Sequence, residues 1–379
     1  MSKAHGIPLS SPDITAAEIQ AVVEVMQSGH LSLGPRIPEF ESQFRQYLGT
    51  REAVAVSSGT AGLHCCLLGL DVGRGDEVIT TPFSFIASAN SILMTGARPV
   101  FVDIDSRTMN MDPEKVSAVI TPRTKAILAV EAFGNPASMN DIAAIAARHE
   151  LPLVEDACEA LGSAYKEKKA GTFGRCGVFA FYPNKQITTG EGGMIVTNDR
   201  ELAETCRSLR NQGRHGGGGW LAHHRLGYNY RLSDIHAAIG VAQMQRLEEI
   251  ITQRQRVAHQ YVQLLLDNPH IVLPTIDKDT AMSWFVFVVR LTDDFTVTDR
   301  DAILQQLRKC NIGCSNYFPP IHLQPFYQEE MGYKPGDYPV TEYASDRTVA
   351  LPFHNHLTAN DCEMVVLQLN KAIAQTRGA

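Results

Sequence analysis

From about residue 50 to residue 200, short runs rich in apolar and β-branched residues alternate with segments of helical periodicity. Such alternation is typical of parallel strands joined by helices, and few architectures accommodate it. We predict strands over Glu52–Val56, Glu77–Thr81, Pro99–Asp103, Lys125–Glu131, Pro152–Glu155, Val178–Tyr182 and Gly193–Thr197. The helices predicted between them cover Thr60–Leu70, Ser84–Met94, Pro113–Ile120 and Asn140–His149. The sequence therefore predicts an open α/β layer around a mainly parallel sheet.

The pattern changes after about residue 232. Elements predicted outside the α/β layer are an N-terminal helix Thr15–Gln27, one long helix Asp234–Leu266 capped by Ser233, an alternating run Ser283–Leu291, a helix after Thr298-x-x-Asp301 and a last helix after Thr358-x-x-Asp361. A long amphipathic helix of this kind typically links a large domain to a small one. We therefore expect a large domain over 1–240, and a linking helix with a smaller α+β domain over 241–379.

Composition excludes several classes of function. The chain has 379 residues with 34 basic and 41 acidic side chains, so a net charge of −7 disfavours nucleic acid or anionic lipid as partners. Neither an apolar leader at the N-terminus nor an uninterrupted apolar run of about 18 residues is present, so we expect a cytoplasmic protein without a membrane partner. The eight cysteines lack metal-ligand spacing, and we predict no metal site.

A first candidate site follows the first predicted strand, where Ser57-Ser58-Gly59-Thr60 opens a helix. Free N–H groups at a helix start, together with hydroxyl groups, form an anion site, and glycine lets a phosphate approach the backbone. The same residues also fit a plain turn with an N-cap. Taken alone, this motif does not decide between the two interpretations.

Two further candidates lie on predicted strand ends or loops. Asp156 follows a predicted parallel strand at the sheet edge where ligands of open α/β folds bind, although a helix cap would look the same. Lys185 lies in a loop between two strands, where partial burial would make its amine a nucleophile; a solvated surface lysine is the alternative. An anion cradle, a strand-end carboxylate and a loop lysine are together the groups that an enzyme dependent on pyridoxal 5'-phosphate (PLP) needs.

At this point the chain resembles the DegT/DnrJ/EryC1/StrS family of sugar aminotransferases, within the aspartate aminotransferase-like fold (PLP fold type I). The segments that carry the resemblance are Gly34-Pro35, Ser58-Gly59-Thr60, Thr81–Ser88, Phe101–Asp105, Glu155-Asp156-Ala157, Lys185 with Thr189–Gly193, Gly227–Arg231 and Tyr317–Pro325. The likeness is strongest to enzymes of the perosamine synthase type, which aminate 4-keto-6-deoxy nucleotide sugars.

The resemblance implies a role for each matching residue. Lys185 would bind PLP covalently and would later shuttle a proton, Asp156 would keep the pyridine nitrogen protonated, and Phe85 would stack on the ring. The phosphate would be bound by Gly59 and Thr60 through their N–H groups and by the hydroxyl of Ser57 or Ser58. Asn229 would reach the site from the partner subunit of a homodimer with shared active sites.

Three residues depart from the common pattern of the family. Ala180 stands where many relatives have a phosphate-binding serine, so one hydroxyl contact is missing. Glu159 stands where many relatives have Gln or His near the phenolic oxygen of the cofactor, and Glu131 replaces a frequent His, which would alter the substrate side of the pocket.

The substrate-binding residues that the resemblance suggests are His322, Arg231 and His215. His322 would line the sugar site, or be hydrogen-bonded within its Pro-rich loop. Arg231 would bind the donor carboxylate, or tie the dimer together. His215 belongs to the loop Arg214–His224, whose Gly216–Gly219 run fits either a plain surface loop or a mobile active-site flap. If it is a flap, we expect part of the substrate specificity from this loop.

The resemblance implies that L-glutamate loads the amino group, giving pyridoxamine phosphate (PMP), and that a keto-deoxy nucleotide sugar then takes it by ping-pong chemistry. One alternative is a nucleotide-sugar dehydratase that uses PMP, but those relatives have His in place of the lysine found here at position 185. The other is a non-catalytic sensor or regulator on the same fold, which the complete set of Lys185, Asp156 and the phosphate turn disfavours.

Overall fold

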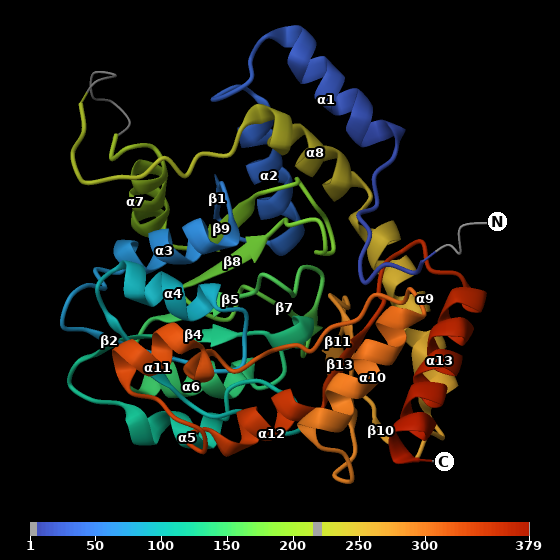
Figure 1. Cartoon of the computed structure of the whole chain (residues 1–379). Helices are drawn as coiled ribbons and strands as arrows, with labels where there is room; N and C mark the ends of the chain where they lie inside the picture. The colour runs from blue at the N-terminus through green and yellow to red at the C-terminus, as the bar shows by residue number, and fades with distance from the viewer. Residues whose placement is uncertain (1–5, 215–221, 379) are drawn as a thin grey trace.

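The computed structural model describes residues 6–214 and 222–378 (Figure 1). Within these residues, a seven-stranded sheet has the strand order β1-β9-β8-β5-β4-β2-β3. Its strands are β1 (Glu52–Val56), β2 (Glu77–Thr80), β3 (Arg98–Phe101), β4 (Thr124–Val130), β5 (Leu153–Asp156), β8 (Cys176–Ala180) and β9 (Gly193–Thr197). All of them run parallel except β9, which is antiparallel to both of its neighbours. The mainly parallel sheet is thus as predicted.

Helices cover both faces of this sheet because its strands are apolar on both sides. On β1, Val54 and Val56 belong to one core cluster, whereas Ala53 and Ala55 belong to another. The first face is covered by α3 (Gly59–Gly69), α4 (Ala87–Met94) and α7 (Arg200–Arg210). The other face is covered by α2 (Arg36–Leu48), α5 (Pro113–Val116), α6 (Met139–Arg148) and α8 (Asp234–Gln245).

A second core lies in the C-terminal part of the chain, on the right in Figure 1. It packs a three-stranded antiparallel sheet against long helices, and Tyr261 and Phe287 are fully buried in it. Its elements are β10 (Ile271–Val272), β12 (Phe287–Leu291), β13 (Thr348–Leu351), α9 (Leu247–Leu265), α10 (Val297–Lys309) and α13 (Ala359–Arg377). Further elements are the helices α11 (Pro325–Met331) and α12 (Pro339–Arg347) and the small sheet of β11 (Thr280–Ala281), β6 (Ala164–Tyr165) and β7 (Lys168–Lys169).

The long helix predicted over Asp234–Leu266 is wrong in one respect, because it is interrupted at Arg246 between α8 and α9. The Arg246 guanidinium lies 3.0 Å from carboxylate oxygens of both Asp13 and Glu18, which belong to the N-terminal segment. The N-terminal helix α1 (Ala16–Ser28) packs beside α8 at the outer end of the molecule (Figure 1). The break between α8 and α9 therefore lies at the residue that binds the N-terminal segment.

The capping box predicted at Thr298 is also wrong by two residues. The side chain of Thr296 accepts a hydrogen bond from the N–H of Asp299, and the side chain of Asp299 accepts one from the N–H of Thr296. Thr298 lies inside the helix. The capping box at Thr358 and Asp361 is confirmed. Helices α2, α7, α11 and α12 and the short hairpin β6-β7 were not predicted. Among the described helices, none has the length and the hydropathy needed to cross a membrane.

Candidate active site

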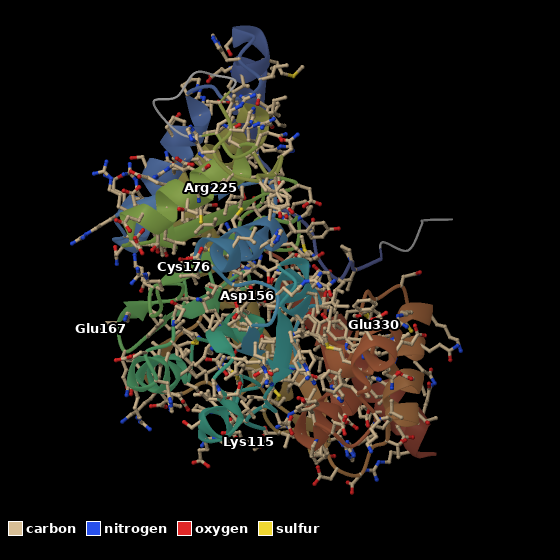
Figure 2. All side chains as sticks on the ribbon, turned by 90° about the vertical axis from the view of Figure 1, so that its left-hand side faces the viewer. Lys115, Asp156, Glu167, Cys176, Arg225 and Glu330 are labelled. Carbon is tan, nitrogen blue, oxygen red and sulfur yellow. The ribbon has the colours of Figure 1, made fainter. Side chains whose placement is uncertain are left out.

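Loops from both parts of the chain line a cavity of about 630 Å³ at the carboxyl edge of the large sheet. Segments after β1, β2, β5 and β8 meet there because the carboxyl ends of parallel strands share one edge. Phe285 and residues 315–319 close the opposite side from the C-terminal part. Asp156, one of the lining residues, lies near the middle of the molecule (Figure 2). The cavity is thus enclosed by the sheet edge and the C-terminal part together.

Lys185 extends into this cavity from the loop after β8. Its side chain is 13 % exposed, and its Nζ lies 3.4 Å from Oε1 of Glu159 and 3.9 Å from the ring centroid of Phe285. Burial raises the pKa of Glu159, and the ammonium group of Lys185 opposes that shift. The N–H of Phe133 donates to the other Glu159 oxygen at 2.9 Å. The amine is therefore held by a fixed carboxyl group and an aromatic face.

Asp156 is the last residue of β5 and is 6 % exposed. Its two carboxylate oxygens have separate donors: the Ser88 hydroxyl donates to Oδ2 at 2.6 Å, and the N–H of Cys158 donates to Oδ1 at 3.3 Å. Hydrogen bonds to the charged form stabilise a buried carboxylate. The side chain is thus fixed in orientation, and each oxygen keeps a lone pair for a further donor.

Helix α3 begins at the cavity wall. Ser58 is its N-cap, and the Ser58 hydroxyl accepts a hydrogen bond from the N–H of Ala61 at 3.1 Å. Gly59 and Thr60 lie in the first turn, where N–H groups have no helix carbonyl to bind, and both line the cavity. A Cβ atom on Gly59 would lie 2.9 Å from the Cβ of Ala180, so the wall is closely packed there. A helix start of this kind can bind an anion through its backbone donors.

The structure brings most of the sequence-predicted site residues to this cavity. They are Lys185, Asp156, Phe85, Ser58, Gly59, Thr60 and Glu159. Ser57 is not among the lining residues, and its N–H donates to the carbonyl of Tyr230 at 2.8 Å. Of the two serines considered for the phosphate, Ser58 is thus the one at the cavity wall.

The structure does not bring His322 to the cavity, contrary to the expectation that it lines the sugar site. Its side chain is fully buried, and Nε2 lies 3.0 Å from Oε1 of Glu342. That geometry matches the alternative of a histidine hydrogen-bonded in its Pro-rich loop. Glu131 also lies outside the cavity and is fully buried, so the altered substrate side that was expected of it is not seen.

Asn229 and Arg231 likewise lie outside the cavity of their own chain. Asn229 is exposed, and the half-buried Arg231 donates through Nη1 to Oδ1 of Asn211 at 3.1 Å. His215 lies outside the described residues. Each of these three assignments therefore remains a prediction.

Sequence reasoning missed several residues that line the cavity. Ser84 and Ser88 flank Phe85 in a segment that had been singled out, and their position just after β2 was the available signal. Phe285 and Tyr317 come from the C-terminal part. Tyr317 begins the segment Tyr317–Pro325 that carries the resemblance, whereas the local sequence around Phe285 carries no sign of the cavity. Only the packing of the two parts places these aromatic rings opposite the sheet edge.

Comparison with known protein families matches residues 12–370 to the DegT/DnrJ/EryC1/StrS aminotransferase family. The chain belongs to this family. It is therefore an aminotransferase, an enzyme of the transferase class.

Similar proteins cover nearly the whole of this aminotransferase. It is 39 % identical to the GDP-perosamine synthase of Caulobacter vibrioides, over 98 % of this chain and 100 % of that one. It is 37 % identical to the spore coat polysaccharide biosynthesis protein SpsC of Bacillus subtilis, over 96 % of each. The PLP form of Streptococcus pneumoniae Spr1654 superposes with a TM-score of 0.93 at 27 % identity, over 98 % of this chain and 100 % of that one. These likenesses confirm the predicted aspartate aminotransferase-like fold.

Proposed function

We propose that this aminotransferase binds PLP in the cavity and moves an amino group from L-glutamate to a keto-deoxy nucleotide sugar of the 4-keto-6-deoxy type. One observation carries the proposal: Lys185, Asp156 and the start of α3 line a single cavity. They supply an amine, a carboxylate and an anion site, the three groups that this cofactor requires. Spr1654 has been solved in both PLP and PMP forms, which supports the cofactor.

The lining residues fit PLP by their chemistry. Lys185 would hold the aldehyde carbon, Asp156 the ring nitrogen, and Ser58, Gly59 and Thr60 the phosphate. Phe85 lines the cavity and is 63 % exposed, so its ring is accessible to the pyridine ring. When bound, PLP supplies an electron sink for the carbon that carries the amino group. Ala180 offers the phosphate a methyl group rather than a hydroxyl.

The protein's own contribution is to position groups and to move one proton. Nζ of Lys185 is the base that moves the proton between the substrate carbon and the cofactor, and Glu159 keeps this atom inside the cavity. The Phe285 ring covers Nζ and keeps water away from one side of it. A water-poor site strengthens the attraction between Asp156 and a protonated ring nitrogen.

The acceptor class is supported by the relatives. One relative is named for the synthesis of GDP-perosamine and another for spore coat polysaccharide biosynthesis. A cavity of about 630 Å³ leaves room for a sugar beside a cofactor. We therefore propose a nucleotide sugar as the acceptor and L-glutamate as the donor.

An absorption experiment tests the first half of the reaction. The purified protein with PLP should show the visible band that PLP acquires when bound to a lysine amine, and L-glutamate should bleach it. Lys185→Ala should lack the band, whereas Lys309→Ala, which changes an exposed lysine of α10, should keep it. A protein without the band, or with a band indifferent to every amino donor, would rule out the proposal. A product that loses oxygen without gaining nitrogen would indicate the dehydratase instead.

We also propose a homodimer in which Asn229 serves the partner's cavity; its exposure outside its own cavity supports this. Mixing Lys185→Ala with Asn229→Ala subunits tests it. If Asn229 crosses the interface, one of the two sites in a mixed dimer keeps both residues, and activity returns. If Asn229 serves its own chain, each site lacks one residue and no activity returns.

A further inference from the structure

Two buried serines connect to Asp156 in a continuous hydrogen-bond chain. Oγ of Ser84 lies 2.8 Å from Oγ of Ser88, and Oγ of Ser88 lies 2.6 Å from Oδ2 of Asp156. The three residues are 5 %, 1 % and 6 % exposed, and all three line the cavity. Ser84 precedes α4, Ser88 lies in its first turn, and Asp156 ends β5, so these hydrogen bonds join the start of α4 to the carboxyl end of β5.

The direction of the proton donors in this chain follows from the geometry. The single hydroxyl proton of Ser88 has three possible acceptors: Oδ2 of Asp156 at 2.6 Å, Oγ of Ser84 at 2.8 Å and the carbonyl of Phe85 at 3.3 Å. The shorter bond to the charged oxygen is the stronger one. Since Ser88 uses its proton on Asp156, its remaining lone pair accepts the proton of Ser84. The order is therefore Ser84 to Ser88 to Asp156.

We propose that Ser84 and Ser88 are positioning residues that hold Asp156 as a carboxylate, turned toward the ring nitrogen of the cofactor. A hydroxyl donor stabilises the charged form of the carboxyl group and leaves a lone pair on each oxygen for the ring N–H. The inference rests on the proposed function, since it assumes that PLP binds here.

The chain offers a matched set of variants. Ser88→Ala removes the donor to Asp156, and Ser84→Ala removes only the outer donor. Ser91→Ala is the control, because Ser91 is a fully buried serine of the same helix whose hydroxyl donates to the Ser88 carbonyl at 2.8 Å. Ser88→Thr restores a hydroxyl at the same position. A general effect of replacing a buried serine with alanine in this region would appear in all three alanine variants.

Two readouts other than activity test the proposal. One is the dissociation constant of PLP, and the other is the solid-state 15N chemical shift of the ring nitrogen of bound, 15N-labelled PLP. Ser88→Ala should weaken PLP binding about tenfold and move the shift toward that of a neutral pyridine. Ser84→Ala should change both readouts in the same direction by a smaller amount. Ser91→Ala should match the wild type, and Ser88→Thr should restore both values.

The outcomes separate this inference from the function on which it rests. If the wild type binds no PLP, the proposed function fails. If the wild type binds PLP but Ser88→Ala has the wild-type shift and affinity, the serine chain has no positioning role. A Ser91→Ala effect as large as that of Ser88→Ala would also overturn the inference. If Ser88→Ala does not fold, the Ser84→Ala variant decides, because it leaves the direct donor to Asp156 in place.

Discussion

Two buried carboxyl groups beneath the sheet edge make the stability of this aminotransferase depend on pH. Glu131 and Glu155 are both fully buried, and the N–H of Gly171 donates to both, at 3.3 Å and 2.9 Å. Burial raises the pKa of Glu155 from its ordinary 4.5 to about 7. Burial, and then the neighbouring Glu155, raise the pKa of Glu131 well above its usual range. We therefore expect folded Glu131 to keep its proton up to neutral pH, whereas unfolded Glu131 loses it.

The sign and the size of the effect follow from proton linkage. A raised pKa in the folded state favours folding at low pH, and this contribution is lost as the pH rises toward the folded pKa. When the folded chain binds one proton more than the unfolded chain, the unfolding free energy falls by about 1.4 kcal/mol for each unit by which the pH rises. Glu131→Gln removes that proton and keeps the shape of the side chain. As the pH rises from 5 to 7, the unfolding free energy of the wild type should therefore fall by about 2.5 kcal/mol more than that of the variant.

Calorimetric melting at pH 5, 6 and 7 and constant ionic strength measures this difference. For a chain of 379 residues, 2.5 kcal/mol corresponds to about 3 °C in the melting temperature. Glu363→Gln is the control, because that glutamate is exposed on α13 and should leave the pH dependence unchanged. If Glu131→Gln and the wild type melt in parallel at all three pH values, Glu131 is not protonated in the folded protein and the reasoning is refuted.

Three further predictions concern other positions. Ala180→Ser adds a hydroxyl at the cavity wall next to Gly59 and should tighten PLP binding about tenfold in a fluorescence titration; unchanged affinity would mean that the phosphate lies elsewhere. Gly62→Ala places a Cβ 2.6 Å from Cγ1 of Val178, so urea unfolding should show a loss of about 1–3 kcal/mol, and wild-type stability would show that α3 can shift freely. Arg246→Met leaves the buried Glu18 without its cation and should lower stability by about 3 kcal/mol, whereas an unchanged urea midpoint would show that this pair contributes nothing.

The sequence predicted the large sheet well because its strands are buried on both faces. Glu52–Val56 and Gly193–Thr197 match β1 and β9 at both ends, and the other strands differ by at most two residues at either end. Continuous apolar runs bounded by polar or glycine residues identify such strands without any knowledge of their partners. The antiparallel direction of β9 carries no local signal, because a strand looks the same in either direction.

Elements that depend on distant contacts or on unusual turns were harder to predict. Helix α2 carries Ile37, Phe40 and Phe44 on its buried side, but Pro38 in its first turn obscures the helical pattern. The hairpin β6-β7 turns through two non-glycine residues with positive φ, 49° and 64°, so the glycine or asparagine typical of such turns is absent. Local sequence patterns therefore fail to predict a helix or a turn when it contains residues that are unusual for that structure.

The candidate site likewise has one half that the sequence predicts and one half that depends on contacts between distant segments. Ser58, Asp156 and Lys185 follow strands of one sheet, so a prediction of that sheet already places them at a common edge. Phe285 comes from the C-terminal part, and its place over Lys185 depends on how that part packs. No spacing along the chain encodes this packing.

Helix α9 supplies a physical reason for the position of Phe285. Arg254 is 4 % exposed, and its guanidinium donates to the carbonyl oxygens of Trp284 at 2.7 Å and of Phe285 at 2.8 Å. Burial lowers the pKa of Arg254 to about 10, because the charged guanidinium is less stable away from water. Because these bonds fix the backbone that carries Phe285, they also fix the ring against the amine of Lys185. The surroundings of that amine are thus set partly by a helix that begins at the break the sequence pattern did not predict.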